Sequence, residues 1–208
     1  LFTKQLNAGE INSLYNETTT TAASATINNP STVAYYKMAD ATDETGSYNL
    51  TASNVDFNVQ GKYGFAGKFN GTNSYLYAAN SVQQPTKNFS VSCWVNFYTI
   101  KAASTGIVAN FKSGGTPQIG WAIAHQNGTP FQFWADGTAS SNGAKAQGTT
   151  NPVAGTWYNI VGTYDGTNIK IYVNGSLEGT TAYSATPAQT DQPLVIGRWY
   201  GNYNDYYT

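Results

Sequence analysis

Three acidic residues, Asp40, Asp43 and Glu44, lie close together in a segment that also contains Gly46. Carboxylate oxygens and backbone carbonyls of loops are the ligands that Ca²⁺ accepts at loose geometry. We therefore expect a calcium site at these residues, with Asp205 as an additional ligand from a distant loop, and no other cofactor. The alternative is that Asp43 and Gly46 form an Asx-type turn without a metal.

A second group of residues suits the recognition of a sugar, because a pyranose stacks its C–H face on a flat ring while its hydroxyls form hydrogen bonds. Residues 198–207 combine many aromatic rings with Asn and Asp, and are too irregular for a strand. The residues that we expect at a ligand-binding site are Trp121, His125, Trp134, Trp199, Tyr200 and Tyr203. The alternatives are core packing or contact with a partner protein, since Tyr and Trp also dominate protein interfaces.

Composition limits the classes of partner. The chain has 208 residues, a formal net charge of −1 and 10% charged residues, against roughly 25% in an average soluble domain. A chain with so little charge has no basic surface for nucleic acid or anionic membranes. No apolar run approaches the roughly 20 residues that span a bilayer. We expect neither nucleic-acid binding nor membrane insertion.

The elements that must position these residues have the periodicity of β-strands. Residues 89–97 alternate strictly, with Val91, Cys93, Val95 and Phe97 on one face and Ser90, Ser92, Trp94 and Asn96 on the other. The runs 158–164 and 169–173 are joined by Asp165-Gly166-Thr167-Asn168, which predicts a hairpin. Residues 61–70 and 74–78 suggest another hairpin around Asn70-Gly71. Many short strands separated by turns predict an all-β sandwich or jelly roll.

Residues 7–15 break this pattern, because Ile11, Leu14 and Tyr15 have helical spacing. Asn7 can cap the N-terminus of a short helix, and Glu10 can complete a capping box. Thr-rich and Ala-rich residues follow and indicate a linker. We therefore expect an N-terminal segment at 1–17, a linker at 18–30 and the main domain at 31–208.

From Val33 to Arg198 the chain resembles a laminin-G-like jelly roll of the concanavalin A-like lectin/glucanase superfamily. The stretches that carry the resemblance are AYYKMADATDETGSYNL (34–50), GKYGFAGKFNGTNSYLY (61–77), FSVSCWV (89–95), GTWYNIVGTYDGTNIKIYVNG (155–175) and PLVIGR (193–198). The resemblance implies two stacked antiparallel sheets, one of them concave, with Trp94 and Trp157 in the core. It adds weight to calcium, which such domains often bind at the rim of the sandwich.

The two ends of the chain depart from this family pattern. The family usually closes with a further strand, a short helix and a Leu-Tyr pair, whereas this sequence stops at Thr208 before that strand. Residues 1–17 look like the end of such a domain. They are expected to be the tail of a preceding repeat in a tandem array, or a segment that completes this sheet or a neighbour's by strand exchange. The alternative is a permuted domain in which they fold onto their own core.

Enzymatic activity is not expected. Glycoside hydrolases of this superfamily carry paired carboxylates on one strand, about 5–5.5 Å apart in retaining enzymes. None of the eleven acidic residues forms such a pair within a strand-like run. The chain has no Gly-x-Ser-x-Gly motif, and Cys93, which alternates with valines, is typical of a buried apolar position.

Two functions remain. The first is a non-catalytic carbohydrate-binding or adhesion module of a secreted, cell-surface or virion-surface protein, whose partner is a glycan or a surface protein. The second is a structural assembly module, such as a virion decoration, fibre or surface-array subunit that binds other protein subunits. The aromatic run at 198–207 distinguishes them, since it would border an open groove in the first case and be covered by a subunit in the second.

Overall fold

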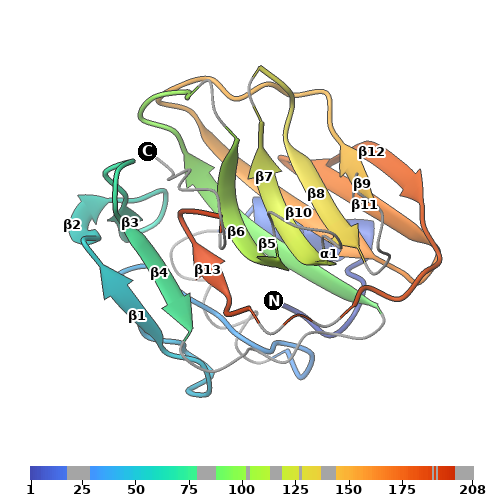
Figure 1. The fold of residues 1–208 in the computed structure, drawn as a ribbon, viewed down its shortest axis with the longest axis horizontal. Helices are drawn as coiled ribbons and strands as arrows, with labels where there is room; N and C mark the ends of the chain where they lie inside the picture. Colours follow the sequence, from blue (N-terminus) through green and yellow to red (C-terminus); the bar gives the residue numbers. More distant parts are fainter. Residues whose placement is uncertain are drawn as a thin grey trace.

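The computed structural model describes residues 1–17, 29–78, 88–101, 104–112, 119–126, 128–136, 144–188, 190 and 192–199. These residues form one helix, α1 (Ala8–Tyr15), and mostly antiparallel strands (Figure 1). The strands are β1 (Leu50–Ser53), β2 (Asp56–Gln60), β3 (Phe65–Lys68), β4 (Tyr75–Ala78), β5 (Phe89–Asn96), β6 (Thr105–Lys112), β7 (Ile119–His125), β8 (Gln132–Asp136), β9 (Lys145–Gln147), β10 (Trp157–Tyr164), β11 (Asn168–Val173), β12 (Ser176–Ala182) and β13 (Val195–Ile196). The predicted all-β fold with one short N-terminal helix is confirmed. None of the helical structure described is long and apolar enough to cross a membrane.

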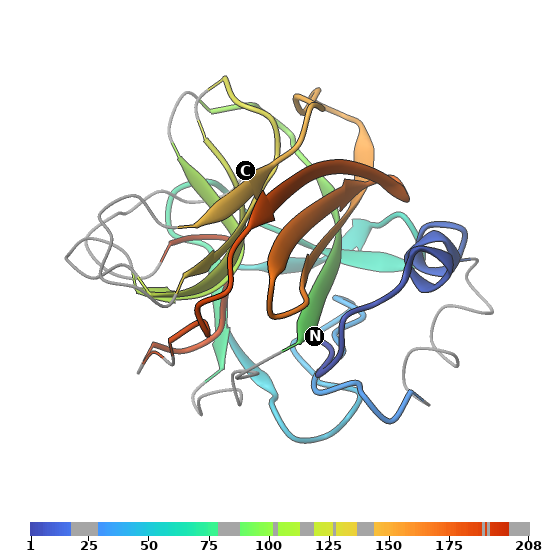
Figure 2. The same cartoon turned by 90° about the vertical axis from the view of Figure 1, so that its right-hand side faces the viewer.

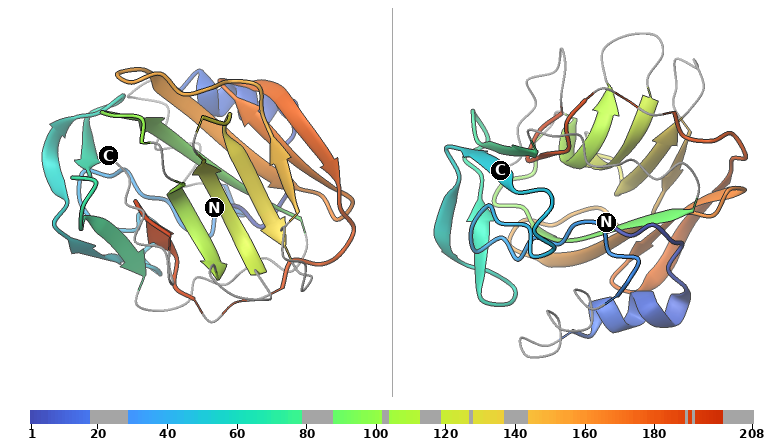
Figure 3. Two further views of the ribbon diagram at one scale, coloured as in Figure 1. Left: turned by 45° about the horizontal axis from the view of Figure 1, so that its top comes forward. Right: turned by 90° about the horizontal axis from the view of Figure 1, so that it is seen from below.

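Two antiparallel sheets form the sandwich. The larger has seven strands in the order β1-β4-β13-β6-β7-β8-β9, and the smaller has four in the order β12-β11-β10-β5. A separate hairpin pairs β2 with β3. The right-hand view in Figure 3 shows the four-stranded sheet between the seven-stranded sheet and α1. This arrangement is the jelly-roll sandwich that the sequence predicts.

The core fills the space between the two sheets. Phe89 of β5 lies at its centre, with ring centroids 6.3 Å from Trp121, 5.9 Å from Phe133 and 6.0 Å from Tyr164. Phe133 also packs over Gly162, where an added Cβ would lie 2.2 Å from the Phe133 ring. Close approach of the two sheets at this point therefore requires glycine.

Alternation along β5 and the hairpin that follows β10 agree with the sequence analysis. Val91, Val95 and Phe97 belong to the core, and β5 pairs with β10 in continuous register. The turn between β10 and β11 is closed by Asp165, whose Oδ1 accepts hydrogen bonds from the N–H groups of Thr167 and Asn168. The Asx geometry at Asp165 is what makes this local turn predictable.

The predicted hairpin between residues 61–70 and 74–78 is wrong. Asn70 does form the expected turn, since its Oδ1 accepts the N–H groups of Thr72 and Asn73. However, the flanking strands diverge: β3 pairs with β2, whereas β4 pairs with β1 and β13. Turn residues specify the reversal of the chain, but the strand partners are selected by burial in the core.

The N-terminal segment docks at the edge of the four-stranded sheet through isolated β-bridges. Phe2 forms antiparallel bridges with Ser90 on one side and with Thr32 on the other. The segment then runs into α1 (Figure 2). Phe2, Leu6 and Ile11 bury their side chains against Val161 and Tyr172 of the sheet. Residues 1–15 therefore pack on the domain formed by this same chain.

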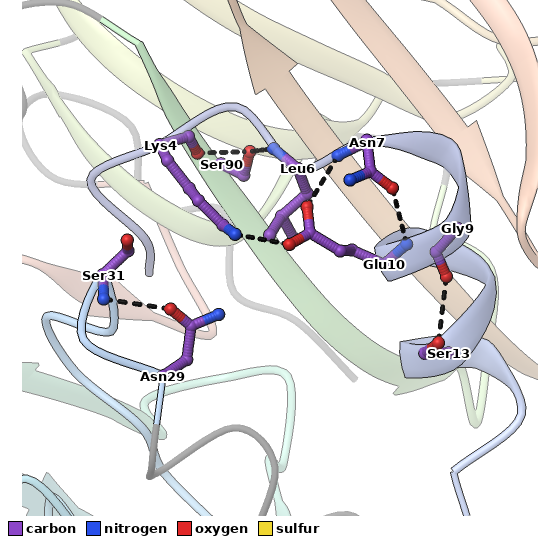
Figure 4. A network of polar contacts seen from close by, with 9 residues as sticks. All are labelled: Lys4, Leu6, Asn7, Gly9, Glu10, Ser13, Asn29, Ser31 and Ser90. Atoms are coloured by element: carbon purple, nitrogen blue, oxygen red, sulfur yellow. Dashed lines mark hydrogen bonds and ion pairs between the residues drawn. The ribbon is translucent and has the colours of Figure 1, made fainter.

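Helix α1 begins with the capping box that the sequence predicts (Figure 4). The side chain of Asn7 accepts a hydrogen bond from the N–H of Glu10 at 3.0 Å, and the Glu10 carboxylate accepts one from the N–H of Asn7 at 2.9 Å. Lys4 forms an ion pair with the same carboxylate. The boundaries 1–17, 18–30 and 31–208 stay predictions, and residues 18–28 of the expected linker lie outside the described residues.

Candidate functional site

Alternation divides the side chains of the seven-stranded sheet between the core and an opposite surface, here called the outer face. The core takes Phe133 and Ala135 of β8 and Ala146 of β9. The side chains that alternate with core residues form the outer face: Tyr75, Tyr77, Ala109, Phe111, Ala122, Ala124, Gln132, Trp134, Asp136, Lys145, Gln147 and Val195. The outer face thus combines aromatic rings, amides and a cation.

At the β8–β9 end of the outer face, polar groups are arranged around Trp134. Its Nε1–H donates to Oε1 of Gln132 at 3.2 Å, and Nε2 of Gln132 donates to Oε1 of Gln147 at 3.0 Å. The Lys145 ammonium lies 4.3 Å from the centroid of the Trp134 ring, and burial lowers the pKa of Lys145. The result is an indole, two carboxamides and an ammonium held in a defined geometry, here called the Trp134 site.

The middle of the outer face is apolar and closed. Phe111 lies with its ring centroid 6.0 Å from Trp134 and 5.7 Å from Trp199. Trp199 is buried and donates its Nε1–H to Oγ of Ser104 at 3.0 Å. Trp199 therefore acts within the described residues as part of the packing that covers the middle of this face.

At the opposite end of the outer face, the guanidinium carbon of Arg198 lies 3.6 Å from the ring centroid of Tyr75. The Tyr75 ring lies 5.9 Å from that of Tyr77. All three side chains are only partly buried. An Arg that stacks on an aromatic ring holds its N–H groups in a fixed plane, which suits the binding of oxygen-rich ligands.

The sequence-predicted binding residues fall into three groups. Trp134 and Trp199 belong to one cluster on the outer face, with Phe111 between them. Trp121 and His125 lie on the core side of β7, so the structure does not bring them together with Trp134 and Trp199. Tyr200 and Tyr203 lie outside the described residues.

The polar residues of the Trp134 site, namely Gln132, Lys145 and Gln147, were not predicted from the sequence. The signal that could have found them is the alternation of β8 (QFWAD), which puts Gln132 and Trp134 on one face. Lys145 and Gln147 flank the core residue Ala146 on the three-residue strand β9. Such a short strand is difficult to distinguish from a loop by periodicity alone.

Trp94 does not lie in the core, as the family resemblance implied, but on the outward side of β5. It contacts Tyr15 and Tyr63 there, and its side chain is partly buried, as is that of Trp157 at the start of β10. The strict alternation of β5 had already put Trp94 on the same face as Ser90 and Ser92. At this position the alternation therefore predicted the side of the strand correctly, and the family resemblance did not.

The Cys93 thiol and the His125 imidazole lie in surroundings that disfavour their charged forms. Burial raises the pKa of Cys93 to about 12, so the side chain is a neutral thiol at physiological pH. His125 is fully buried with its ring 5.7 Å from that of Phe97, and burial lowers its pKa. Each behaves as a packed core residue in this geometry.

The acidic loop is organised by Asp43, which is buried. Its Oδ1 accepts hydrogen bonds from the N–H groups of Tyr35 and Thr45. Its Oδ2 accepts from the Thr45 hydroxyl at 2.6 Å and the N–H of Tyr48 at 3.0 Å. Burial by itself raises the pKa of Asp43, but the hydrogen bonds from Thr45, Tyr35 and Tyr48 outweigh it and lower the pKa. Asp43 thus closes the loop through its own hydrogen bonds.

The other expected calcium ligands lie apart from this arrangement. Asp40 is exposed and accepts the N–H of Thr42 at 2.8 Å. Glu44 forms an ion pair with Lys37 at 2.9 Å, and Asp205 lies outside the described residues. Within the described ranges, no three His, Cys, Asp or Glu side chains gather in a way that could hold a metal ion. Calcium binding remains a prediction.

Comparisons with known proteins agree with this architecture. The family model described as the concanavalin A-like lectin/glucanases superfamily matches residues 70–208. No curated protein matches the chain by sequence. Among solved structures, domain 4 of AbnA, a GH43 extracellular arabinanase from Geobacillus stearothermophilus in complex with arabinotriose, has a TM-score of 0.59 at 17% identity, over 84% of this chain and 86% of that one.

Two further structures share the fold over a part of a longer chain. The binding domain of botulinum neurotoxin serotype D has a TM-score of 0.55 at 18% identity, over 75% of this chain and 40% of that one. A sialidase from Trypanosoma rangeli has a TM-score of 0.57 at 12% identity, over 84% of this chain and 28% of that one. At these identities the likeness concerns the fold.

Proposed function

The chain belongs to the concanavalin A-like lectin/glucanases superfamily. On this basis we propose that it is a non-catalytic carbohydrate-binding module. The protein that carries it would be secreted or exposed on the surface of a cell or a virion. The observation that carries this proposal is the Trp134 site. An indole ring, two linked carboxamides and an ammonium lie together on one face of the sheet. The structural neighbour with arabinotriose bound supports a saccharide as the ligand class.

The chemistry of binding follows from the groups present. Trp134 is 7% exposed, and the Lys145 ammonium covers its ring in the structure, so a sugar reaches the indole only when the flexible Lys145 side chain turns away. A sugar that takes its place stacks a C–H face on the indole. Gln147, whose side chain is exposed, and Lys145 then bind hydroxyls of the sugar. Gln132 keeps the indole and Gln147 in position through its two hydrogen bonds.

Calorimetric titration with arabinotriose and a glycan array test this proposal. Lys145→Ala and Gln147→Ala should weaken saccharide binding about tenfold each, which corresponds to roughly 1.4 kcal/mol. Tyr98→Ala is the matched surface control, because Tyr98 is 77% exposed and contacts Lys68 away from the outer face. Binding that is unchanged in Lys145→Ala and Gln147→Ala, or no saccharide binding at all, would contradict the Trp134 site as the ligand site.

A second candidate function is assembly, for which the position occupied by the N-terminal segment offers a route. Phe2 pairs with both Ser90 and Thr32, and Ile11 is completely buried against the sheet. A segment that occupies such a position can be supplied by a neighbouring repeat or subunit through strand exchange.

Trans-complementation tests this second candidate. The chain without residues 1–17 should melt at a lower temperature than the full chain, and a peptide of residues 1–17 should restore the melting temperature of the full chain. A shortened chain that melts like the full one excludes strand exchange through this segment.

A further inference from the structure

A second aromatic cluster lies on the four-stranded sheet, on the side away from the seven-stranded sheet. Trp94 of β5 stacks with Tyr15 from the last turn of α1, with centroids 5.9 Å apart and planes inclined by 23°. Tyr63, at the tip of the β2–β3 hairpin, meets Trp94 edge-on at 5.7 Å. The Lys62 ammonium lies 5.1 Å from the centroid of the Trp94 ring. Two segments distant in sequence thus converge on the indole of a third.

The residues of this cluster are only partly covered in the structure. Tyr15, Tyr63 and Trp94 are each partly buried, and Lys62 is exposed. The tip of the hairpin is a tight turn, in which the N–H of Gly61 donates to the carbonyl of Gly64 at 2.8 Å. This turn presents Lys62 and Tyr63 side by side at the edge of the cluster. The cluster is therefore a surface feature with a rigid frame.

Packing of the rings leaves two polar atoms unexplained. Nε1 of Trp94 is buried and has no hydrogen-bond partner among the described residues. Asn159 of β10 is directly opposite Trp94 in the strand register, and its Oδ1 is likewise buried and unpartnered in the described part of the chain. The Asn159 residue is only 1% exposed. Buried polar groups in native proteins almost always have a partner, so this pair calls for one.

The nature of the two atoms limits what the missing partner can be, and a group that both accepts and donates would serve both of them. An indole N–H only donates, and a carboxamide oxygen only accepts. A hydroxyl group can accept from the first and donate to the second. A hydroxyl-rich ligand with an apolar C–H face could form hydrogen bonds with the two polar atoms and pack its C–H groups against the aromatic rings. Saccharides combine these two properties.

We propose that Trp94, Asn159, Tyr15 and Tyr63 form a second saccharide-binding site, separate from the Trp134 site and on the other sheet. Because both polar atoms are covered in the structure, Lys62 and Tyr63 move off the indole when the sugar binds, and one hydroxyl of the sugar then bridges Nε1 of Trp94 and Oδ1 of Asn159. Lys62 binds ring or hydroxyl oxygens of the sugar. The module then has one saccharide site on each sheet, so that it can join two glycan chains or hold one chain with added avidity.

The test is nuclear magnetic resonance of the indole N–H groups, because the chain has five Trp and hence five such signals. Trp94→Phe identifies the Trp94 signal by its loss. Arabinotriose, lactose and sialyllactose are then titrated to millimolar concentrations into the full chain and into Lys145→Ala, in which the Trp134 site is impaired. The Trp94 signal should shift for at least one saccharide in both proteins.

Two substitutions test the chemistry of the site. Asn159→Leu, which keeps the volume and removes the acceptor, should weaken the Trp94-linked binding at least fivefold. Tyr63→Ala at the hairpin tip should have a similar effect, whereas Tyr98→Ala should have none. Melting curves of each variant establish that the fold is retained, and Tyr63→Ala provides the test if Asn159→Leu does not fold.

The outcomes separate this proposal from the first one. A shift of the Trp134 signal with no shift of Trp94 overturns the second site and leaves the first intact. A Trp94 shift that disappears in Lys145→Ala means that one site accounts for both signals, which also overturns the second site. If neither signal moves, both proposals fail. A Trp94 shift that persists in Lys145→Ala and weakens in Asn159→Leu or Tyr63→Ala supports the second site, independently of the Trp134 site.

Discussion

The N–H of Leu6 donates a hydrogen bond to Oγ of Ser90 at 2.9 Å, and the same hydroxyl donates to the carbonyl of Lys4 at 2.9 Å. Ser90 is completely buried. One hydroxyl therefore satisfies two backbone groups of the N-terminal segment where it leaves the sheet for α1 (Figure 4). This serine is the main polar link between that segment and β5.

Replacement of Ser90 by Ala should lower the free energy of unfolding by about 1–3 kcal/mol, because the Leu6 N–H and Lys4 carbonyl lose their partner in a buried position. Urea denaturation measures this change. Ser92→Ala is the matched control, since Ser92 lies on the same face of β5 but is only partly buried. Equal effects of the two substitutions would mean that the link does not stabilise the fold.

Asp165 makes stability depend on pH in the acidic range. Burial raises its pKa, but hydrogen bonds from Thr167 and Asn168, with the charge of Lys170, lower it to about 2 from 3.8. Because the folded pKa lies below the unfolded one, this contribution is complete above about pH 4 and is lost as the pH falls through the folded pKa of about 2. Asp165→Asn should cost about 1 kcal/mol at pH 7 and clearly less at pH 2. Urea denaturation across this range measures it, and a difference independent of pH would refute the assignment.

His125 acts in the same direction as Asp165, but closer to neutral pH. Burial lowers its pKa below the ordinary 6.5, so the folded chain disfavours the protonated form. Its contribution to stability is therefore present above pH 6.5 and declines as the pH falls below that value. Proton resonances of the imidazole follow this directly, as His125 is the single histidine. His125→Leu should remove the decline between pH 7 and 5, whereas an imidazole that titrates at 6.5 or above would show that burial has no such effect.

Asp43→Ala should destabilise the chain by about 2–4 kcal/mol, because the N–H groups of Tyr35, Thr45 and Tyr48 lose a common acceptor. Asp43→Asn keeps one acceptor oxygen and should cost less. Thermal melting measures both.

Calcium binding at the acidic loop is tested by melting curves recorded with and without calcium. Bound calcium should raise the melting temperature of the native chain and not that of Asp40→Asn. Melting curves that are identical with calcium and with a chelator would contradict a calcium site.

Local signals made much of the fold predictable from sequence. The capping box of Asn7 and Glu10 involves residues three positions apart, and Asp165 closes its turn within three residues. Alternation along β5 assigned each side chain to its face. Such features depend on neighbouring residues only, so the sequence specifies them directly.

Features that depend on distant partners were less predictable. The turn at Asn70 was recognised, but the pairing of β4 with β13, more than a hundred residues away, was not. The Trp134 site needs Lys145 and Gln147 from a neighbouring strand of three residues. Trp121 and Trp134 look alike in sequence, yet the first faces the core and the second the outer face. Only the register of β7 against β8 decides between them.

The bridges from Phe2 to Ser90 and Thr32 also constrain the order of folding. Pairing of β10 with β11 closes a short loop, whereas Phe2 must wait until β5 has joined that sheet, because closing the longer loop costs more entropy. We therefore expect the N-terminal segment to join the four-stranded sheet only after β5, β10 and β11 have paired, and to detach from it before they separate. Amide hydrogens of Phe2 and Leu6 should exchange with solvent through a partial opening that leaves those of Ile160 protected.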